Sequence, residues 1–254
     1  MTIRDDHALA ADLATEAGNR LLALREREGF EHPPSLRKEG DQQAHVFLME
    51  ALARLRPSDS VLSEEATREE RLDPRRQTAD RVWIVDPLDG TREYSEEGRS
   101  DWAVHVALWE RGVLTAGAVA LPAQGRTLTT GEPPKLPVFD GGRFRIAVSR
   151  TRPPEFVQKL AYLAGADLVP IGSAGAKISA VLTGEVEAYV HAGGQFEWDS
   201  AAPVAVAQAA GAFCSRIDGS ELTYNQVDPS LPDILVSLPE LAPTLLAGIR
   251  DLHR

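Results

Sequence analysis

The fold is decided by the stretch Trp83-Ile84-Val85-Asp86-Pro87-Leu88-Asp89-Gly90-Thr91-Arg92-Glu93-Tyr94, in which an apolar run leads into a turn and then into a glycine and a hydroxyl. The β-branched and aromatic run that ends at Val85 predicts a central strand covered on both faces. Because Pro87 cannot donate to a strand ladder, we expect the strand to end there. The turn that follows can bring the carboxylates of Asp86 and Asp89 to one point.

This turn combines two acids with a candidate anion site. Gly90 allows a ligand to approach the backbone, and the amides after it can hold an anion at the start of a helix. Two carboxylates beside an anion repel it unless a cation lies between them, which favours a divalent metal that bridges protein and phosphate. An Asp-Pro turn with solvated acids is the alternative, and the spacing alone does not decide between the two.

Composition narrows the class of protein. The chain has 254 residues and 43% hydrophobic residues, enough for one large domain or two ordinary ones with a real core. Its net charge of -11 disfavours binding to a nucleic acid polymer. The single cysteine, Cys214, excludes an internal disulfide and fits a reducing compartment. The charged start Met1 to Asp6 has no apolar h-region, and no apolar run is long enough for a membrane span, so we expect a cytoplasmic protein that does not bind a membrane.

The order of predicted elements indicates two parts. Helical spacing and capping residues predict helices at residues 5–28, 41–55, 153–163, 174–182, 201–210 and 239–252. Strands are expected at residues 60–63, 82–87, 102–109, 113–121, 127–130, 145–149, 168–171, 186–191, 212–217 and 234–237. We expect the prolines of His32-Pro33-Pro34-Ser35 to end the first helix. The Gly and Pro residues of 131–137 predict a boundary between an N-terminal part, 1–130, and a C-terminal α/β part, 131–254.

Further acids lie at predicted strand ends or helix starts. They are the pair Glu64-Glu65, Asp41, and Asp199, which follows Trp198. Hard cations such as Mg²⁺ prefer carboxylate oxygens completed by water and phosphate, and the absence of a Cys/His cluster disfavours zinc. Each acid alone has an ordinary alternative, namely an exposed carboxylate or a helix N-cap.

A second candidate anion site is the junction Gly172-Ser173-Ala174-Gly175-Ala176-Lys177. Small residues let a ligand approach the amides of a helix start, and Lys177 adds a point charge suited to phosphate. The glycine spacing is not that of a P-loop. The alternative is a helix start built of small residues with a solvated lysine.

Three of these segments together resemble the inositol monophosphatase superfamily of magnesium-dependent, lithium-sensitive phosphatases. The resemblance rests on Ser63-Glu64-Glu65, on the Asp-Pro-Leu-Asp-Gly-Thr motif of residues 86–91, and on Trp198-Asp199 followed by small residues up to Gly211. The continuation Arg92-Glu93-Tyr94 and the segment 172–177 are most similar to the 3'(2'),5'-bisphosphate nucleotidase branch, the CysQ-type 3'-phosphoadenosine 5'-phosphate (PAP) phosphatases. The resemblance implies a layered α/β/α/β/α sandwich.

The resemblance also implies roles for individual residues. The implied metal ligands are Glu64, Asp86, the carbonyl of Leu88, Asp89 and Asp199, holding two or three Mg²⁺ ions that Li⁺ displaces. The implied catalytic residues are Glu64, Thr91 and Asp41, with Thr91 orienting the attacking water and Asp41 polarising Thr91. The implied substrate contacts are Gly90, Thr91, Arg92, Ser173, Lys177 and Asp199, with Tyr224 and Asn225 on the adenine side. The residues around Asp41 depart from the family pattern.

The expected function is a phosphomonoesterase that removes the 3'-phosphate of PAP, or of its sulfated form PAPS, by in-line attack of a metal-activated water. An inositol monophosphatase or fructose-1,6-bisphosphatase on the same scaffold is the alternative. A non-catalytic sensor of bisphosphate nucleotides is a third reading. A small phosphorylated nucleotide is therefore the expected partner, and the protein is expected to be a monomer or a homodimer.

Overall fold

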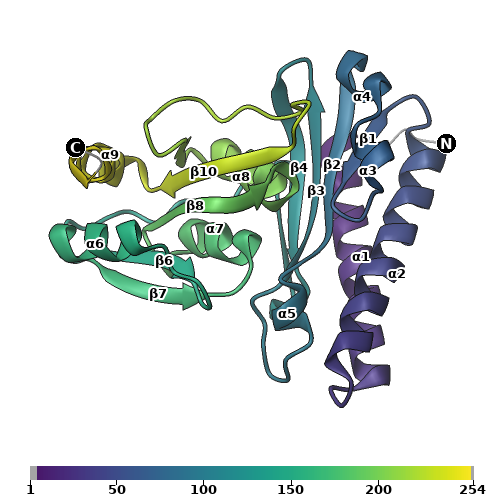
Figure 1. Ribbon diagram of the computed structural model, residues 1–254, viewed down its shortest axis with the longest axis horizontal. Helices are drawn as coiled ribbons and strands as arrows, with labels where there is room; N and C mark the ends of the chain where they lie inside the picture. The colour runs from purple at the N-terminus through teal and green to yellow at the C-terminus, as the bar shows by residue number, and fades with distance from the viewer. Residues whose placement is uncertain (1–4, 253–254) are drawn as a thin grey trace.

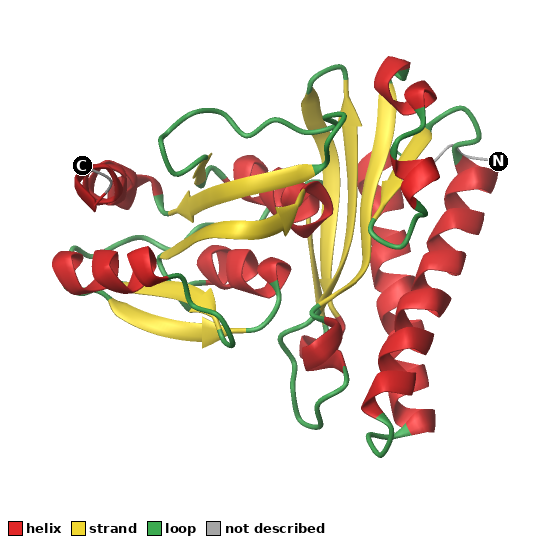
Figure 2. Cartoon of the chain, viewed as in Figure 1, coloured by secondary structure: helices red, strands yellow, loops and turns green. Residues whose placement is uncertain are grey.

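The computed structural model describes residues 5–252, which fold into five alternating layers of helices and sheets (Figure 1). Two N-terminal helices form one outer layer, and the first sheet lies against them. Two helices separate this sheet from the second sheet, and a last pair of helices covers the far side (Figure 2). The predicted α/β/α/β/α sandwich is confirmed. Residues 1–4, the beginning of the charged N-terminal segment considered above, lie outside the described residues, as do residues 253–254.

The first sheet has the strand order β1-β2-β3-β4-β5. Its strands are β1 (Ser60–Ser63), β2 (Arg81–Asp89), β3 (Ala103–Glu110), β4 (Val113–Leu121) and β5 (Arg126–Thr129). β1 and β2 are parallel, and the other neighbours are antiparallel. The hairpin between β3 and β4 turns at Arg111 and Gly112, as predicted, and both residues have positive φ.

The second sheet has the strand order β7-β6-β8-β10-β9. Its strands are β6 (Arg145–Ser149), β7 (Asp167–Ile171), β8 (Ala188–Phe196), β9 (Phe213–Ser215) and β10 (Ser230–Ser237). β6 is parallel to both β7 and β8, whereas β10 is antiparallel to β8 and β9. The carboxyl ends of three parallel strands therefore meet at one edge of this sheet.

The longer helices form three layers. α1 (Asp6–Glu28) and α2 (Pro33–Leu55) cover the outer face of the first sheet, α7 (Ala174–Thr183) and α8 (Glu197–Ala210) lie between the sheets, and α6 (Glu155–Ala164) and α9 (Ala242–Leu252) cover the second sheet. The short helices are α3 (Arg68–Arg71), α4 (Pro74–Thr78) and α5 (Thr91–Tyr94), with 3-10 turns η1 (Pro122–Gln124) and η2 (Pro239–Leu241). No helix within residues 5–252 is long and apolar enough to cross a membrane.

The start of α2 differs from the prediction. We expected Pro33 and Pro34 to end the first helix and the second to begin at Asp41, which is wrong. α1 ends at Glu28 before Gly29, and α2 begins at Pro33. Proline is accepted in the first turn of a helix, because the N–H that it lacks would have no helical partner there. Asp41 consequently lies within α2 and is not its N-cap.

The central helix α8 is shared by the two sheets. Its buried Ala202 and Val204 belong to one apolar cluster with Ile84 of β2 and Val236 of β10. The strands of the first sheet all precede residue 130, and those of the second all follow it. The division into two parts, 1–130 and 131–254, stays a prediction. The central apolar cluster contains residues from both parts.

Candidate active site

A β-bulge in β2 brings Asp86 and Asp89 to the same face of the first sheet. Asp86 pairs with His105 of β3, but Asp89, three positions later, pairs with a residue only two positions away from His105. Side chains three positions apart in a regular strand point to opposite faces, and one extra residue reverses this. The prediction that the strand ends at Pro87 is therefore wrong: the strand continues to Asp89, because a bulge tolerates a residue without an N–H.

Glu64 reaches the same place from the neighbouring strand. Ser63, the last residue of β1, pairs in parallel register with Val85, and the N–H of Glu64 donates to the carbonyl of Val85 at 3.3 Å. Glu64 therefore lies beside Asp86, and each carboxyl affects the pKa of the other. Burial raises the pKa of Glu64 to about 7, and the charge of Asp89 acts in the same direction.

Asp86, Asp89 and His105 form a buried group whose nearest ligand atoms lie within 4.8 Å of one another. Burial and the charge of Glu64 raise the pKa of Asp86 well above its ordinary value, and its Oδ2 has no hydrogen-bond donor among residues 5–252. Asp89 differs: burial would raise its pKa, but the adjacent imidazole of His105 and the N–H of Gly175 lower it. Asp89 Oδ2 lies 2.7 Å from that N–H and 3.2 Å from His105 Nε2.

His105 was missed by sequence reasoning. Its Nδ1 lies 3.0 Å from the carbonyl oxygen of Trp198 and must carry a proton there, because a carbonyl only accepts. Burial would lower the pKa of His105, but the contacts with Asp89 and with this carbonyl raise it. The available signal was a single titratable residue within the apolar strand 103–108, since a buried polar group requires a partner.

Asp199 faces the cluster from the central layer. α8 begins at Glu197, four residues before the predicted start, so Asp199 lies in the first turn and accepts the N–H of Phe196 at 2.7 Å. Burial, followed by the charge of Asp89, raises the pKa of Asp199 to about 7. Four carboxyls, three from the first sheet and one from the central helix layer, therefore act on one another electrostatically.

Thr91 and Asp41 are in contact beside this cluster. Thr91 Oγ1 lies 3.1 Å from the carbonyl oxygen of Leu88 and 3.3 Å from Asp41 Oδ1, and its single proton can be donated to only one of them. Burial and the charge of Glu65 raise the pKa of Asp41 to about 7. Glu65 itself is exposed. The structure thus brings together the two residues that the resemblance pairs, one from α2 and one from α5.

The junction before α7 lies directly against the loop after β2. Gly90 has φ of 83°, and a Cβ on it would come within 2.9 Å of the Cβ of Ser173. Ser173 caps α7, its Oγ accepting the N–H of Ala176 at 2.9 Å. A Cβ on Gly175 would lie 2.0 Å from His105 Nε2, so only glycine permits this approach. Two segments far apart in the sequence, both predicted to hold phosphate, are therefore neighbours.

The two predicted cations differ in their surroundings. Lys177 is buried, and its Nζ donates to the carbonyl oxygens of Ile171 at 3.4 Å and Gly172 at 2.5 Å. Burial lowers the pKa of its ammonium. Arg92 is exposed, and its guanidinium has no hydrogen-bond or ion-pair partner within the described part of the chain. Arg92 is available to a ligand, whereas two of the three N–H groups of Lys177 Nζ are already donated to carbonyl oxygens.

Tyr224 and Asn225 are buried rather than exposed beside a ligand. The hydroxyl of Tyr224 lies 3.0 Å from Ser200 Oγ, and the N–H of Asn225 donates to Glu197 Oε2 at 2.7 Å. The guanidinium of Arg76 donates to Asn225 Oδ1 at 2.6 Å. These bonds attach the loop before β10 to α8 and α4, and an adenine contact from this pair stays a prediction.

Cavities lie at both ends of β2. One of about 560 Å³ is lined by Thr91, Asp41 and Glu65, together with two cations of α2, Arg37 and Lys38. Neither Asp41 nor Glu65 forms an ion pair with these cations in the described part of the chain.

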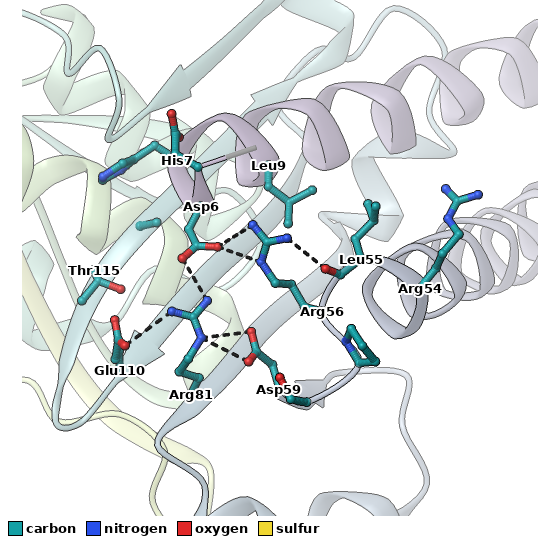
Figure 3. Close-up of a pocket in the computed structure, with 14 residues that line it drawn as sticks. Asp6, His7, Leu9, Arg54, Leu55, Arg56, Asp59, Arg81, Glu110 and Thr115 are labelled. Carbon is teal, nitrogen blue, oxygen red and sulfur yellow. Dashed lines mark hydrogen bonds and ion pairs between the residues drawn. The ribbon is translucent and has the colours of Figure 1, made fainter. Parts of the chain in front are cut away.

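A larger cavity, of about 1430 Å³, surrounds Arg81 at the other end of the strand (Figure 3). There Arg81 contacts Asp6 at 2.9 Å, Asp59 at 3.1 Å and Glu110 at 3.4 Å, so opposite charges are already paired. We therefore place the candidate active site at the smaller cavity.

Comparison with known proteins agrees with this geometry. The model of the inositol monophosphatase family matches residues 7–253. The chain belongs to the inositol monophosphatase family. It is 50% identical to the 3'-phosphoadenosine 5'-phosphate phosphatase of Mycobacterium leprae, over 97% of this chain and 94% of that protein. It is 33% identical to the 3'(2'),5'-bisphosphate nucleotidase CysQ of Escherichia coli, over 78% of this chain and 83% of that protein.

Solved structures of the inositol monophosphatase family share the fold. Inositol monophosphatase II of Staphylococcus aureus superposes with a TM-score of 0.80 at 23% identity, covering 97% of this chain and 95% of that one. The SuhB protein of Mycobacterium tuberculosis superposes with a TM-score of 0.71 at 24% identity, covering 97% and 96%. At these identities the likeness concerns the fold alone.

The acid cluster fits the divalent cation of a metal-dependent phosphatase. Glu64, Asp86, Asp89 and Asp199 supply carboxylate oxygens, and a hard cation prefers such donors. Three of these four carboxyls have raised pKa values, and Asp86 Oδ2 lacks a donor, as expected of a cluster that needs positive charge to ionise. As a family member, this chain therefore carries a buried acidic site suited to a metal-dependent phosphatase.

Proposed function

We propose that the protein removes the 3'-phosphate of 3'-phosphoadenosine 5'-phosphate, giving AMP and inorganic phosphate. The observation that carries the proposal is the 50% identity with a protein of that name over 97% of this chain. The exposed, unpaired guanidinium of Arg92 supports it, because a bisphosphate needs more positive charge than a monophosphate. The lone cysteine, Cys214, supports action in the reducing cytoplasm.

The metal site of the proposal uses five ligands: Glu64, Asp86, the carbonyl of Leu88, Asp89 and Asp199. Two or three Mg²⁺ ions bound there supply positive charge for the phosphoryl oxygens and increase the acidity of water. Li⁺ competes for one of these positions and inhibits. The bulge that aligns Asp86 with Asp89 supports this assignment, since it points both carboxylates the same way.

Residues of the chain orient the attacking water and bind the scissile phosphate. Thr91 accepts a hydrogen bond from the attacking water when its own proton is donated to Asp41, so the pair fixes the direction of attack. A carboxyl with a pKa of about 7, as at Asp41, can take up a proton near neutral pH. The backbone amides of Gly90 and Thr91 hold oxygens of the scissile phosphate, where preorganised donors stabilise developing charge.

The other phosphate and the leaving group lie on the side of the second sheet. Ser173 and Lys177 bind the phosphate that is not cleaved, with Arg92 contributing charge from α5. Asp199 contacts the ribose beside the leaving oxygen. The contact between Gly90 and Ser173 supports this arrangement, because it places the two phosphate-binding segments next to each other.

A comparison of substrates tests the proposal. We expect kcat/KM with Mg²⁺ to be at least about tenfold higher for 3'-phosphoadenosine 5'-phosphate than for inositol 1-phosphate or fructose 1,6-bisphosphate, equivalent to about 1.4 kcal/mol of preferential transition-state binding. Assays of the sulfated nucleotide PAPS and of each substrate with added Li⁺ complete the set. A preference for inositol 1-phosphate would instead identify an inositol monophosphatase on the same scaffold.

Absence of phosphate release from every substrate, with nucleotide binding retained, would favour a non-catalytic sensor. The contact between Thr91 and Asp41 opposes that reading, because a protein that only binds the nucleotide has no use for residues that orient water. Light scattering after size exclusion would distinguish a monomer from a homodimer.

A further inference from the structure

One carboxylate outside the acid cluster holds the segment that leads into α7. Asp101 lies in the loop between α5 and β3, and its side chain is 14% exposed. Its Oδ2 accepts the N–H of Gly172 at 2.6 Å, and its backbone oxygen accepts the N–H of Ser173 at 3.1 Å. Arg99 Nε donates to Asp101 Oδ1 at 2.8 Å. Asp101 therefore accepts hydrogen bonds from two successive amides of the turn between β7 and α7.

Gly172 is held from its other side as well. Its carbonyl oxygen accepts a hydrogen bond from Lys177 Nζ. A Cβ on Gly172 would lie 2.3 Å from Glu93 Cγ and 2.8 Å from Asp101 Oδ2, so the backbone of this turn rests directly on the loop that precedes β3. The turn belongs to the chain of the second sheet, whereas Asp101 and Glu93 belong to that of the first.

The residues that follow this turn reach the candidate active site. Ser173 lies against Gly90, and the N–H of Gly175 donates to Asp89. We infer that Asp101 is a positioning residue, which sets where Ser173 and the start of α7 stand relative to Gly90. This inference rests on the proposed function, since it gives the turn a part in binding the nucleotide.

The arrangement predicts which kinetic constant depends on Asp101. Thr91, Asp41 and Glu64 are carried by α5, α2 and the end of β1, and none of the three side chains forms a hydrogen bond with the turn in the described part of the chain. Loss of the Asp101 carboxylate should therefore leave the residues around the attacking water in place. The substrate groups held by the start of α7 lose alignment, so binding weakens more than the chemical step does.

The chain provides a matched control in Asp233, on β10. Its side chain is 15% exposed, it pairs with Arg216, and its Oδ1 accepts the N–H of Ile217 at 2.9 Å. Asp233 thus has the same burial and the same kinds of partner as Asp101. Asp233 differs in its position: it binds Arg216 and Ile217, and neither residue leads directly into the candidate active site.

The experiment compares Asp101→Ala, Asp101→Asn and Asp233→Ala in the full chain. Kinetics with 3'-phosphoadenosine 5'-phosphate and Mg²⁺ should show KM raised about tenfold in Asp101→Ala, with kcat within about threefold of wild type. Asp101→Asn should stay within about threefold in KM, because an amide oxygen still accepts the N–H of Gly172. Asp233→Ala should leave KM unchanged.

Hydrogen–deuterium exchange supplies a readout that does not depend on the substrate. The amides of 172–176 should exchange faster in Asp101→Ala than in wild type, and at the wild-type rate in Asp233→Ala. Unchanged exchange of 172–176 in Asp101→Ala, or equal effects of Asp101→Ala and Asp233→Ala on KM, would overturn the inference. If the wild type fails to hydrolyse the nucleotide, the proposed function fails, while the exchange result still decides whether Asp101 holds the turn.

Discussion

The N–H of Gly175 donates to Asp89 Oδ2 at 2.7 Å and so attaches the start of α7 to the bulge of β2. Asp89 is thereby both a candidate metal ligand and a link between the segments of the two sheets. The pKa of Asp89 is lowered whereas those of Glu64, Asp86 and Asp199 are raised, because at Asp89 the effects of His105 and Gly175 exceed that of burial.

Asp89→Asn should abolish turnover and leave the fold intact. An amide oxygen can still accept the N–H of Gly175, so the segment contact survives, but the charge needed to hold a cation is lost. A metal contributes several kcal/mol of transition-state stabilisation, so we expect kcat to fall by about 10³-fold. Phosphate release measures the loss, and circular dichroism checks the fold. A variant that kept a tenth of the wild-type kcat would contradict this role of Asp89.

Thr91→Val should lower kcat by about 10²–10⁴-fold, the range typical of a lost proton-transfer partner, with a smaller change in KM. Valine keeps the branched shape but removes the hydroxyl that lies between Leu88 and Asp41. Thr91→Ser retains the hydroxyl and serves as the control, expected within about tenfold of wild type. If Thr91→Val and Thr91→Ser lose equal activity, the hydroxyl does not orient water.

The metal-free protein should be more stable at pH 5.5 than at pH 7.5. Folding raises the pKa of Asp41, Glu64 and Asp199 to about 7, from ordinary values of 3.8 or 4.5. Between pH 4 and 7 the folded chain therefore holds protons that the unfolded chain releases, and stability falls as pH rises through this window. Burial lowers the pKa of His45 and His191, which opposes the effect near pH 6. The pKa shifts of the three carboxyls are larger than those of the two histidines, so the net stability of the metal-free protein falls as pH rises.

Thermal unfolding after chelation measures this dependence. Mg²⁺ should raise Tm more at pH 7.5 than at pH 5.5, because ionised carboxylates bind it and protonated ones do not. A metal-free Tm that rises from pH 5.5 to pH 7.5 would show that ionisation of these buried carboxyls does not destabilise the fold.

Asp59→Ala should destabilise the fold without changing kcat. Asp59 is almost fully buried, contacts Arg81, and accepts the indole N–H of Trp83 at 2.8 Å. Its removal leaves that donor unpaired and part of the Arg81 charge uncompensated, so we expect about 2–3 kcal/mol less free energy of unfolding. Urea denaturation measures the change.

Asp80→Ala is the matched control for Asp59→Ala. Its exposed carboxylate pairs with Arg111 at the surface, and we expect no measurable loss of stability. Equal effects of the two substitutions would show that the buried ion pairs around Arg81 do not stabilise the fold. A large loss of kcat in Asp59→Ala would show that the two ends of β2 are coupled.

Local patterns predicted most elements and the residues of the acid cluster. Asp86 and Asp89 follow an apolar run, Glu64 ends a neighbouring strand, and both features can be read within a few residues of sequence. The five-layer fold came from the resemblance, since the order of strands in a sheet depends on contacts between distant segments. The start of α2 was missed because proline ends helices and also begins them.

The parts of the site that were missed depend on tertiary pairing. His105 joins the cluster because the bulge sets the register of β2 against β3. The contact of Asp101 with Gly172 requires a loop of one sheet to meet a turn of the other. Neither relationship has a local signature, so the sequence showed the residues but not their partners.

The shared helix α8 has a consequence for synthesis of the chain on the ribosome. Apolar residues of the first sheet such as Ile84 and Val119 are covered by α8, whose residues 197–210 are made long after β4 is complete. A nascent chain that ends between them presents this sheet with one face in water, a state that favours aggregation. Docking of α8 therefore both covers that face and delivers Asp199, so the step that completes the acid cluster is also the step that protects the exposed sheet.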